Sequence, residues 1–246
     1  MNKTEPFGIV HDLLFEDYRQ LSGINQSTLK QWIPASSIKP MNQNNSQAMK
    51  FGTAGHCLLL EPELFLKKYI NAPAGINKRG KVGKERWSKY AQKYPNKILL
   101  QTSEWKRLEK IRKFFEVHPE VQKIWKNGDS EVSLFWKDSD YHIKCKARLD
   151  WLNRDFGTII DLKFTNNISR AFSMESLGDY YTLQACWYIR AVTQLTSKVP
   201  DFFFVFIEKY APHNMTVRSI SRSDIEKGKQ IIEHVIKKSQ IGVFNE

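Results

Sequence analysis

The sequence is poor in cysteine and has no long apolar run. Its three cysteines, Cys57, Cys145 and Cys186, lie far apart in 246 residues, and none belongs to a CxxC pair. This spacing argues against a disulfide framework and against a four-thiolate zinc or iron–sulfur site, so we expect small buried apolar side chains. The longest apolar stretch, Phe202–Ile207, is far shorter than the roughly 20 residues that span a bilayer, so no membrane association is predicted.

Residues 1–12 lack the basic-then-apolar pattern of a signal peptide, and we therefore expect a cytoplasmic protein. The composition, 41% hydrophobic and 26% charged, is ordinary for a globular protein and excludes disordered and collagen-like classes. No internal repeat or long linker is visible. A chain of this length predicts a single domain, with a mainly helical part over residues 1–127 and a sheet with flanking helices over residues 128–246.

Acidic residues are scarce between Lys67 and Lys113. This segment has 15 lysines and arginines but three acidic residues, so its excess equals the net charge of +12 of the whole chain. A basic segment on an otherwise neutral protein is typical of a polyanion-binding surface, although a solvated helical face has the same composition. Its aromatic side chains could stack on bases or belong to the core: Trp87, Tyr90, Tyr94 and Trp105.

Hydrophobic periodicity predicts an α/β fold with one central mixed β-sheet flanked by helices. We expect helices at residues 28–32 (capped by Ser27), 48–69 (broken near Pro62), 84–94, 103–117, 177–192 and 223–238 (with a Ser223–Glu226 capping box). Residues 72–83 are predicted to form a loop. Strands are expected at residues 131–137, 141–152, 158–165, 200–208 and 215–220.

Two of these strands carry residues that suggest chemistry. Strand alternation places Asp161 and Lys163 on one face, and the turn at residues 153–157 would form a hairpin that brings Asp150 beside Asp161. Because adjacent carboxylates repel, a divalent cation between them is the natural resolution, and carboxylate oxygens suit Mg²⁺. Lys163 could orient or deprotonate a water, or offset charge on a phosphate. A surface ion pair is the alternative interpretation.

The pattern Asp150…Asp161-Leu162-Lys163 resembles the PD-(D/E)xK nuclease signature, and more specifically the chain resembles the RecE-type exodeoxyribonuclease VIII family of the RecB and lambda-exonuclease group. Five ordered blocks between about Ser27 and Tyr188 carry this resemblance. They are residues 48–63, residues 71–79 with Gly83, Lys84 and Trp87, residues 131–136, residues 145–150, and the Gln184-Ala-Cys-Trp-Tyr188 motif.

The resemblance implies a role for each matching residue. His56, Asp150, Asp161 and the Leu162 carbonyl would bind metal, with Lys163 as the catalytic lysine. Glu131 would serve a second metal or its water, or be a plain strand-edge charge. Gln184 and Tyr188 would position the terminal nucleotide or its phosphate. The alternative is an ordinary core tyrosine that is hydrogen-bonded to a glutamine. For His56, the alternative is a histidine of the hydrophobic core. Lys78, Arg79, Lys81, Lys84 and Arg86 would contact DNA.

Two positions depart from the family pattern. Leu149 replaces the proline of the signature, at a position that makes no metal contact. Gly55 precedes the histidine where an apolar residue is more usual, and a glycine inside a helix costs about 1 kcal/mol relative to alanine. We therefore expect the helix to loosen or bend beside His56.

The expected function is a Mg²⁺-dependent (or Mn²⁺-substituted) 5′-to-3′ exonuclease on linear double-stranded DNA that leaves 3′ single-stranded tails. By resemblance it would form a homo-oligomeric ring, a tetramer or trimer, and act beside a single-strand annealing protein. An endonuclease or single-strand-specific nuclease of the same superfamily, or an inactive DNA-binding module, remains an alternative. An iron–sulfur nuclease is disfavoured because the cysteines are scattered, and membrane binding because no helix has a clean apolar face.

Overall fold

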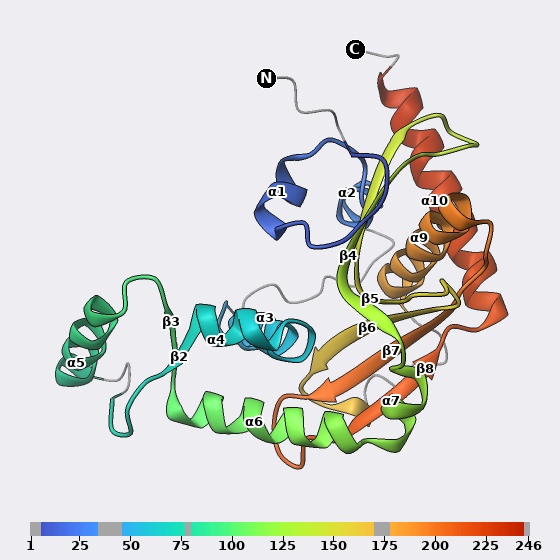
Figure 1. The fold of residues 1–246 in the computed structure, drawn as a ribbon. Coiled ribbons are helices and arrows are strands. Elements are labelled where there is room, and N and C mark those ends of the chain that lie inside the picture. Colours follow the sequence, from blue (N-terminus) through green and yellow to red (C-terminus); the bar gives the residue numbers. More distant parts are fainter. Residues whose placement is uncertain (1–5, 34–45, 77–79, 170–177, 244–246) are drawn as a thin grey trace.

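The computed structural model describes residues 6–33, 46–76, 80–169 and 178–243, and it is built around a six-stranded sheet (Figure 1). The strand order is β1-β4-β5-β6-β7-β8. The strands are β1 (Gly8–Val10), β4 (Gly128–Lys137), β5 (Lys144–Asn153), β6 (Thr158–Thr165), β7 (Asp201–Glu208) and β8 (Met215–Ser219). All five predicted strands are present. β1, too short to give a pattern, adds to the sheet from the part of the chain expected to be mainly helical.

The sheet is mixed, as predicted. β4, β5 and β6 form an antiparallel meander, whereas β6 and β7 run parallel and are connected through α9 (Asp179–Thr196). β7 is a nearly continuous apolar run because both of its faces are covered. The β6–β7 pairing extends over all eight residues of each strand, so it fixes the register of β6.

Helices cover both faces of the sheet and enclose two cores. α2 (Gln26–Trp32), α9 and α10 (Arg222–Val243) lie on one face. α3 (Ser46–Leu60), α4 (Pro62–Lys68), α6 (Thr102–Val117) and α7 (Pro119–Ile124) lie on the other (Figure 1). Ile159 belongs to the first core, and Ile160 and Leu162 to the second. The predicted alternation along β6 is therefore confirmed.

An arm projects from the body between α4 and α6 (Figure 1). β2 (Tyr69–Asn71) and β3 (Ile98–Leu100) pair in parallel at its base, and α5 (Gly80–Lys93) lies at its end with no buried residue. The loop predicted up to residue 83 is wrong at its end, because α5 already begins at Gly80. Neither β2 nor β3 was predicted, since three-residue strands show no alternation.

Helix ends differ from the sequence prediction in two places. Asn25, not Ser27, caps α2, and its side chain accepts a hydrogen bond from the Thr28 N–H at 2.9 Å. The capping box of α10 is Ser221 with Asp224, two residues earlier than predicted: the Asp224 N–H donates to Ser221 Oγ at 3.1 Å. The predicted break near Pro62 is confirmed, because α3 ends at Leu60. α1 (Phe15–Gln20) and α7 were not predicted.

Cys145 and Cys186 are buried and unpaired, as predicted, whereas Cys57 is partly buried. Within the four described ranges, no helix combines the length and the apolar character needed to cross a membrane.

Candidate active site

The β5–β6 hairpin brings Asp150 and Asp161 together, as the sequence predicted. Its ladder contains the pairs Leu152–Ile159 and Trp151–Ile160. Asp150 and Asp161 stand at the next position, where β5 and β6 separate. There the Leu162 N–H donates to Asp150 Oδ2 at 2.8 Å instead of continuing the backbone ladder. The two carboxylates therefore lie side by side at the point where β5 and β6 separate.

The charges at this point are strongly coupled. Burial, and then the negative charge of Asp161, raise the pKa of Asp150 well above its usual value, while Lys163 opposes the rise. Asp161 is 1% exposed, and its Oδ2 forms an ion pair with the Lys163 ammonium. Burial lowers the pKa of Lys163, but Asp161 and Asp150 outweigh burial and leave this pKa raised. Lys163 is thus an ammonium group held by the carboxylates.

Gln184 and Tyr188 reach this cluster from one face of α9. Gln184 Nε2 donates to Asp161 Oδ1 at 2.7 Å, and its Oε1 accepts from Lys163 Nζ at 3.2 Å. The same Nε2 lies 3.4 Å from the Tyr188 hydroxyl, which is buried and has a strongly raised pKa because of that burial. The spacing of four residues places both side chains at the carboxylates, as predicted.

His56 approaches the carboxylates from α3. Its Nδ1 lies 3.9 Å from Asp150 Oδ2, and its side chain is 31% exposed. Burial, only partly offset by the charge of Asp161, lowers the pKa of His56 to about 4. The imidazole is therefore neutral at neutral pH, which is the form that binds metal.

The expected loosening or bending of the helix beside His56 is wrong. α3 continues through Gly55 without a break, and the Phe164 ring of β6 packs directly on this glycine. A Cβ atom at residue 55 would lie 2.3 Å from Phe164 Cζ. Glycine is needed here for close approach of the ring, which also lies beside His56 with 5.4 Å between ring centroids.

Glu131 stands in the same row of the sheet as the two aspartates. The flanking pairs Ser130–Trp151 and Val132–Leu149 place it opposite Asp150, and its own backbone has φ 55°, in the left-handed region. Its carboxylate pairs with Arg148 Nε at 2.5 Å. Glu131 adds to the raised pKa of Asp150, so it lies close to the site, but its charge is already matched by Arg148.

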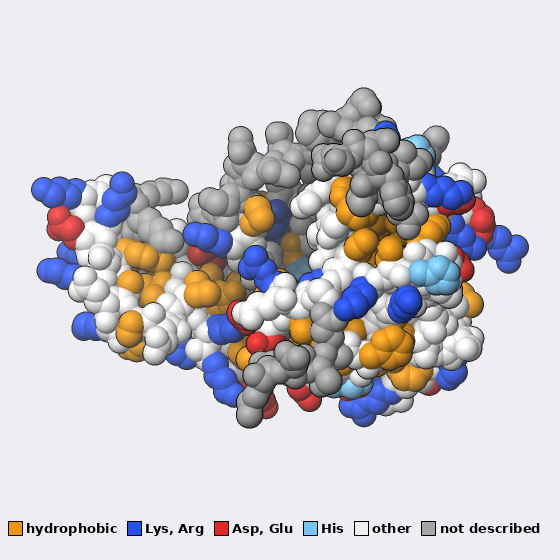
Figure 2. Space-filling model, turned by 90° about the horizontal axis from the view of Figure 1, so that it is seen from above, with side chains coloured by type: hydrophobic (Ala, Val, Ile, Leu, Met, Phe, Trp, Pro, Cys, Tyr) orange, Lys and Arg blue, Asp and Glu red, His pale blue; other side chains and the backbone are white. Residues whose placement is uncertain are grey.

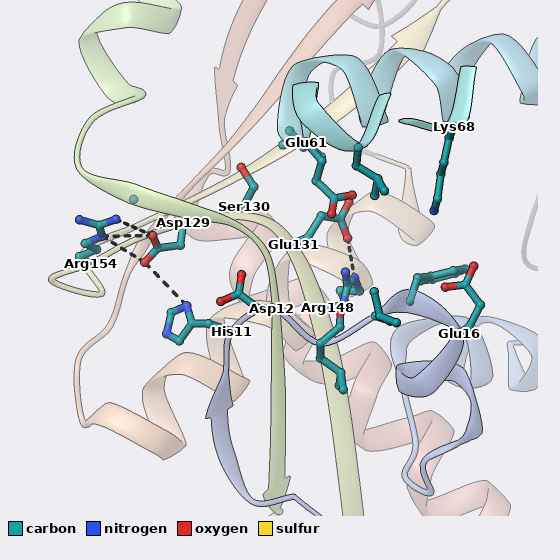
Figure 3. Close-up of a pocket in the computed structure, with 16 residues that line it drawn as sticks. His11, Asp12, Glu16, Glu61, Lys68, Asp129, Ser130, Glu131, Arg148 and Arg154 are labelled. Atoms are coloured by element: carbon teal, nitrogen blue, oxygen red, sulfur yellow. Dashed lines mark hydrogen bonds and ion pairs between the residues drawn. The ribbon is translucent and has the colours of Figure 1, made fainter. Parts of the chain in front are cut away.

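A cavity of about 800 Å³ opens beside Glu131 (Figure 3). Figure 3 shows the carboxyl groups of Glu61 and Glu131 pointing toward each other. Burial, and then Glu131, raise the pKa of Glu61. Sequence reasoning did not select Glu61, although it lies in the residue 48–63 block that carries the family resemblance. The other ionisable residues lining the cavity are His11, Asp12, Glu16, Lys68, Asp129, Arg148 and Arg154.

Lys30 of α2 is a further site residue that sequence reasoning did not select. Its Nζ lies 3.4 Å from Gln184 Oε1, a contact between residues 154 positions apart. No pattern in the local sequence around Lys30 predicts this contact. A lysine on the apolar-to-polar border of a short helix is common, and the packing of α2 against α9 decides where it points.

The residues at the carboxylate pair fit a hard divalent cation. They offer two carboxylates, a neutral imidazole and the Leu162 carbonyl, and oxygen-rich sets of this kind suit Mg²⁺. Asp161 Oδ2 is buried and has the Lys163 ammonium as its partner among the described residues, so this carboxylate oxygen keeps a lone pair that a cation could use. In the described part of the chain, no three His, Cys, Asp or Glu side chains are already arranged around one metal position.

The predicted DNA-contacting residues lie apart from this cluster. Lys81, Lys84 and Arg86 are exposed on α5, and Figure 2 shows basic side chains around the projecting arm. Lys78 and Arg79 lie outside the described residues. Of the four aromatic residues, Trp105 packs on Phe65 of the second core (5.2 Å between ring centroids), while Tyr90 and Tyr94 pair on the arm.

Comparison with solved structures identifies proteins that share the fold of this chain. The chain resembles the crystal structure of a protein from Eubacterium rectale that carries the provisional name of an exonuclease. The TM-score is 0.62 at 14% identity, over 93% of this chain and 85% of that one. A second structure, SSO0001, aligns over 49% of this chain and 56% of that one with a TM-score of 0.30 at 17% identity. No curated protein matches the chain.

The likeness to the Eubacterium rectale structure shows a shared fold. One family model, described as a PDDEXK-like domain of unknown function (DUF3799), matches residues 28–241. This range contains Lys30, His56 and the whole carboxylate cluster. The chain therefore belongs to this PDDEXK-like family, within the PD-(D/E)xK nuclease superfamily.

Proposed function

We propose that the protein is a Mg²⁺-dependent exonuclease that degrades one strand of linear double-stranded DNA from its 5′ end and leaves 3′ single-stranded tails for strand annealing. The observation that carries this proposal is the cluster of Asp150, Asp161, Lys163 and Gln184, joined by direct contacts at the point where β5 and β6 separate. The 5′-to-3′ polarity and the role in annealing are supported by the resemblance to the RecE-type family alone.

Asp150, Asp161, His56 and the Leu162 carbonyl would hold Mg²⁺, or Mn²⁺ in its place. The bound ion would supply a Lewis acid and lower the pKa of a water molecule. Lys163, held as an ammonium by Asp161 and Gln184, donates hydrogen bonds to the phosphate oxygen or to the attacking water. Gln184 fixes both the Asp161 carboxylate and the Lys163 ammonium, so it orients the groups that contact the scissile phosphate.

The arm would bind the DNA backbone. The exposed Lys81, Lys84 and Arg86 on α5, continued by the basic residues of α6, offer a positive surface that releases counterions from DNA. Tyr90 and Tyr94 could stack on bases of a displaced strand. Replacing Lys81 and Lys84 together by glutamine should lower the slope of log affinity against log salt by about 2. An unchanged slope would assign DNA binding to another surface.

Digestion of one plasmid, either linear or covalently closed, tests the nuclease proposal. With Mg²⁺ the linear form should disappear while the closed circle persists, and EDTA should stop the reaction. The Asp161→Asn variant, prepared in the same way, controls for a contaminating nuclease. Cutting of the closed circle would establish an endonuclease at the same site. Binding without cleavage of either form would favour a DNA-binding module.

End-labelled duplexes then test polarity. A 5′ label should be released at once and a 3′ label should persist until late in digestion. We also propose, from the family resemblance, a homo-oligomeric ring (trimer or tetramer) and a single-strand annealing partner. Sedimentation of the protein with and without linear DNA tests the ring, and a monomer under both conditions would contradict it.

A further inference from the structure

Lys30 is held rigidly, although it lies on a helix of only seven residues. Leu29 beside it is fully buried in the first core, and Asn25 caps the helix. Just before the cap, the Ile24 N–H donates to the Lys144 carbonyl at 2.9 Å and the Ile24 carbonyl accepts from the Lys146 N–H at 2.8 Å. α2 is thereby fixed to β5, and the direction of the Lys30 side chain is set by these contacts.

The Lys30 ammonium shares an acceptor with the catalytic lysine. Gln184 Oε1 lies 3.4 Å from Lys30 Nζ and 3.2 Å from Lys163 Nζ. The Lys30 Nζ also lies 5.7 Å from the centre of the Tyr180 ring. One amide oxygen therefore holds two ammonium groups close together at the edge of the carboxylate pair.

Lys163 has a carboxylate partner, whereas Lys30 has none among the described residues. Asp161 pairs with Lys163 and Gln184, and among the described residues no carboxylate forms an ion pair with Lys30. Burial, and then the positive charge of Lys163, lower the pKa of Lys30 to about 8, with Asp161 opposing the change. An ammonium has three donors, and the described contacts of Lys30 use one of them. A partly buried cation without an anionic partner is a site that awaits an anion.

We propose that Lys30 forms a binding site for one phosphate group of the substrate strand, directly beside the Asp161–Lys163 pair. This inference rests on the proposed function, because it takes DNA as the substrate. With a divalent cation bound, Asp150 and Asp161 would both be ionised, and their two negative charges would offset those of the cation. Lys163 and Lys30 then add two positive charges, which suits a phosphodiester that gains negative charge during hydrolysis.

The phosphate could be the scissile group inside the strand or a phosphate at the strand end. Both sources present the same oxygens to the Lys30 ammonium. The experiment therefore uses duplexes that end in a phosphate or in a hydroxyl, and duplexes with a single uncharged methylphosphonate at the first linkage.

The test compares wild type, Lys30→Met, Lys30→Arg and Lys229→Met. Lys229, exposed on α10 beside Glu226, is a control for loss of one positive charge. DNA affinity is measured with Ca²⁺ in place of Mg²⁺ over a range of salt, and kcat and KM are measured with Mg²⁺. Thermal unfolding of each variant checks that the fold is retained, and Lys30→Arg keeps the test informative if Lys30→Met is unstable.

We expect Lys30→Met to lose about 10- to 100-fold in kcat/KM and in DNA affinity, the effect of one charged hydrogen bond. Its salt slope should fall by about 1. Lys30→Arg should recover most of both losses, and Lys229→Met should match wild type. The loss in Lys30→Met should vanish on the hydroxyl-ended duplex if the site takes a terminal phosphate, or on the methylphosphonate duplex if it takes the internal one.

Two results would overturn the phosphate site. One is a Lys30→Met variant that matches Lys229→Met in every measurement. The other is a variant that loses turnover but keeps its DNA affinity and salt slope, because Lys30 would then act only by positioning Gln184. A failure of the proposed function looks different, since wild type itself would neither bind nor cut DNA.

Discussion

Replacing Gly55 by alanine tests how closely α3 sits on β6. A Cβ atom at residue 55 would lie 2.3, 2.7 and 2.9 Å from three atoms of the Phe164 ring. The ring must therefore move. It lies beside His56 of α3, with 5.4 Å between ring centroids, and Phe164 directly follows Lys163 in β6. The substitution perturbs both sides of the candidate site without removing any of its polar groups.

Two effects of opposite sign set the magnitude. Alanine favours a helix interior over glycine by about 1 kcal/mol. Forcing an extra carbon into a packed contact costs about 1–3 kcal/mol. The net change for Gly55→Ala is a loss of about 0–2 kcal/mol in the free energy of unfolding. Gly52 is the matched control on the same helix face, because a Cβ there would lie at an ordinary 3.8 Å from Phe164 Cβ. Gly52→Ala should stabilise the protein by up to about 1 kcal/mol.

Urea denaturation of both variants, and of Gly55→Ala combined with Phe164→Leu, measures this balance. The double variant should recover stability because the shorter side chain vacates the position that the new Cβ needs, giving a coupling energy of about 1–3 kcal/mol. Cleavage by Gly55→Ala should fall by up to about 100-fold, since small displacements of catalytic groups are costly. If Gly55→Ala is as stable as Gly52→Ala and fully active, Phe164 does not pack on Gly55 as described.

Three further predictions concern charges in the fold. Because the folded pKa of Asp150 is raised, the metal-free protein should lose stability as pH rises from about 4 through that folded pKa. Asp150→Asn should therefore raise the Tm of the protein at neutral pH in EDTA. An unchanged or lower Tm would contradict the repulsion between Asp150 and Asp161. Burial raises the pKa of Asp138, but hydrogen bonds from Arg190 (2.6 Å) outweigh it and leave this pKa lowered. The stabilisation of the fold by the Asp138–Arg190 pair should therefore be present above about pH 3.9 and be lost as pH falls through the folded pKa. Asp138→Asn should lower the free energy of unfolding by about 3 kcal/mol in urea denaturation at pH 7. A loss below about 1 kcal/mol would show that the fold does not need this pair. Lys146 is 5% exposed and donates to the Tyr18 carbonyl of α1 at 3.1 Å. Lys146→Met should therefore lower the free energy of unfolding by about 1–3 kcal/mol and speed amide hydrogen exchange in α1. Unchanged exchange would show that other contacts hold α1.

The parts of the fold that follow from local pattern were predictable. Strand alternation placed Asp161 and Lys163 on one face of β6, and the short polar turn after residue 152 placed Asp150 beside them. The spacing of Gln184 and Tyr188 put both on one face of α9. Each of these inferences involves residues close in sequence or a period fixed by backbone geometry, which the sequence states directly.

The remaining features depend on contacts between distant segments. The arm of β2, β3 and α5 has strands of three residues, too short for any period to show. Glycine is needed at residue 55 because the ring of Phe164, 109 positions further along the chain, packs on it. Gln184, which Lys30 contacts, is 154 positions away from it in the chain. The sequence by itself determined the longer strands and helices and the residue types at the carboxylate pair. Only the tertiary structure decided which helix approaches which strand and which charges are left without a partner, because packing between distant segments sets both.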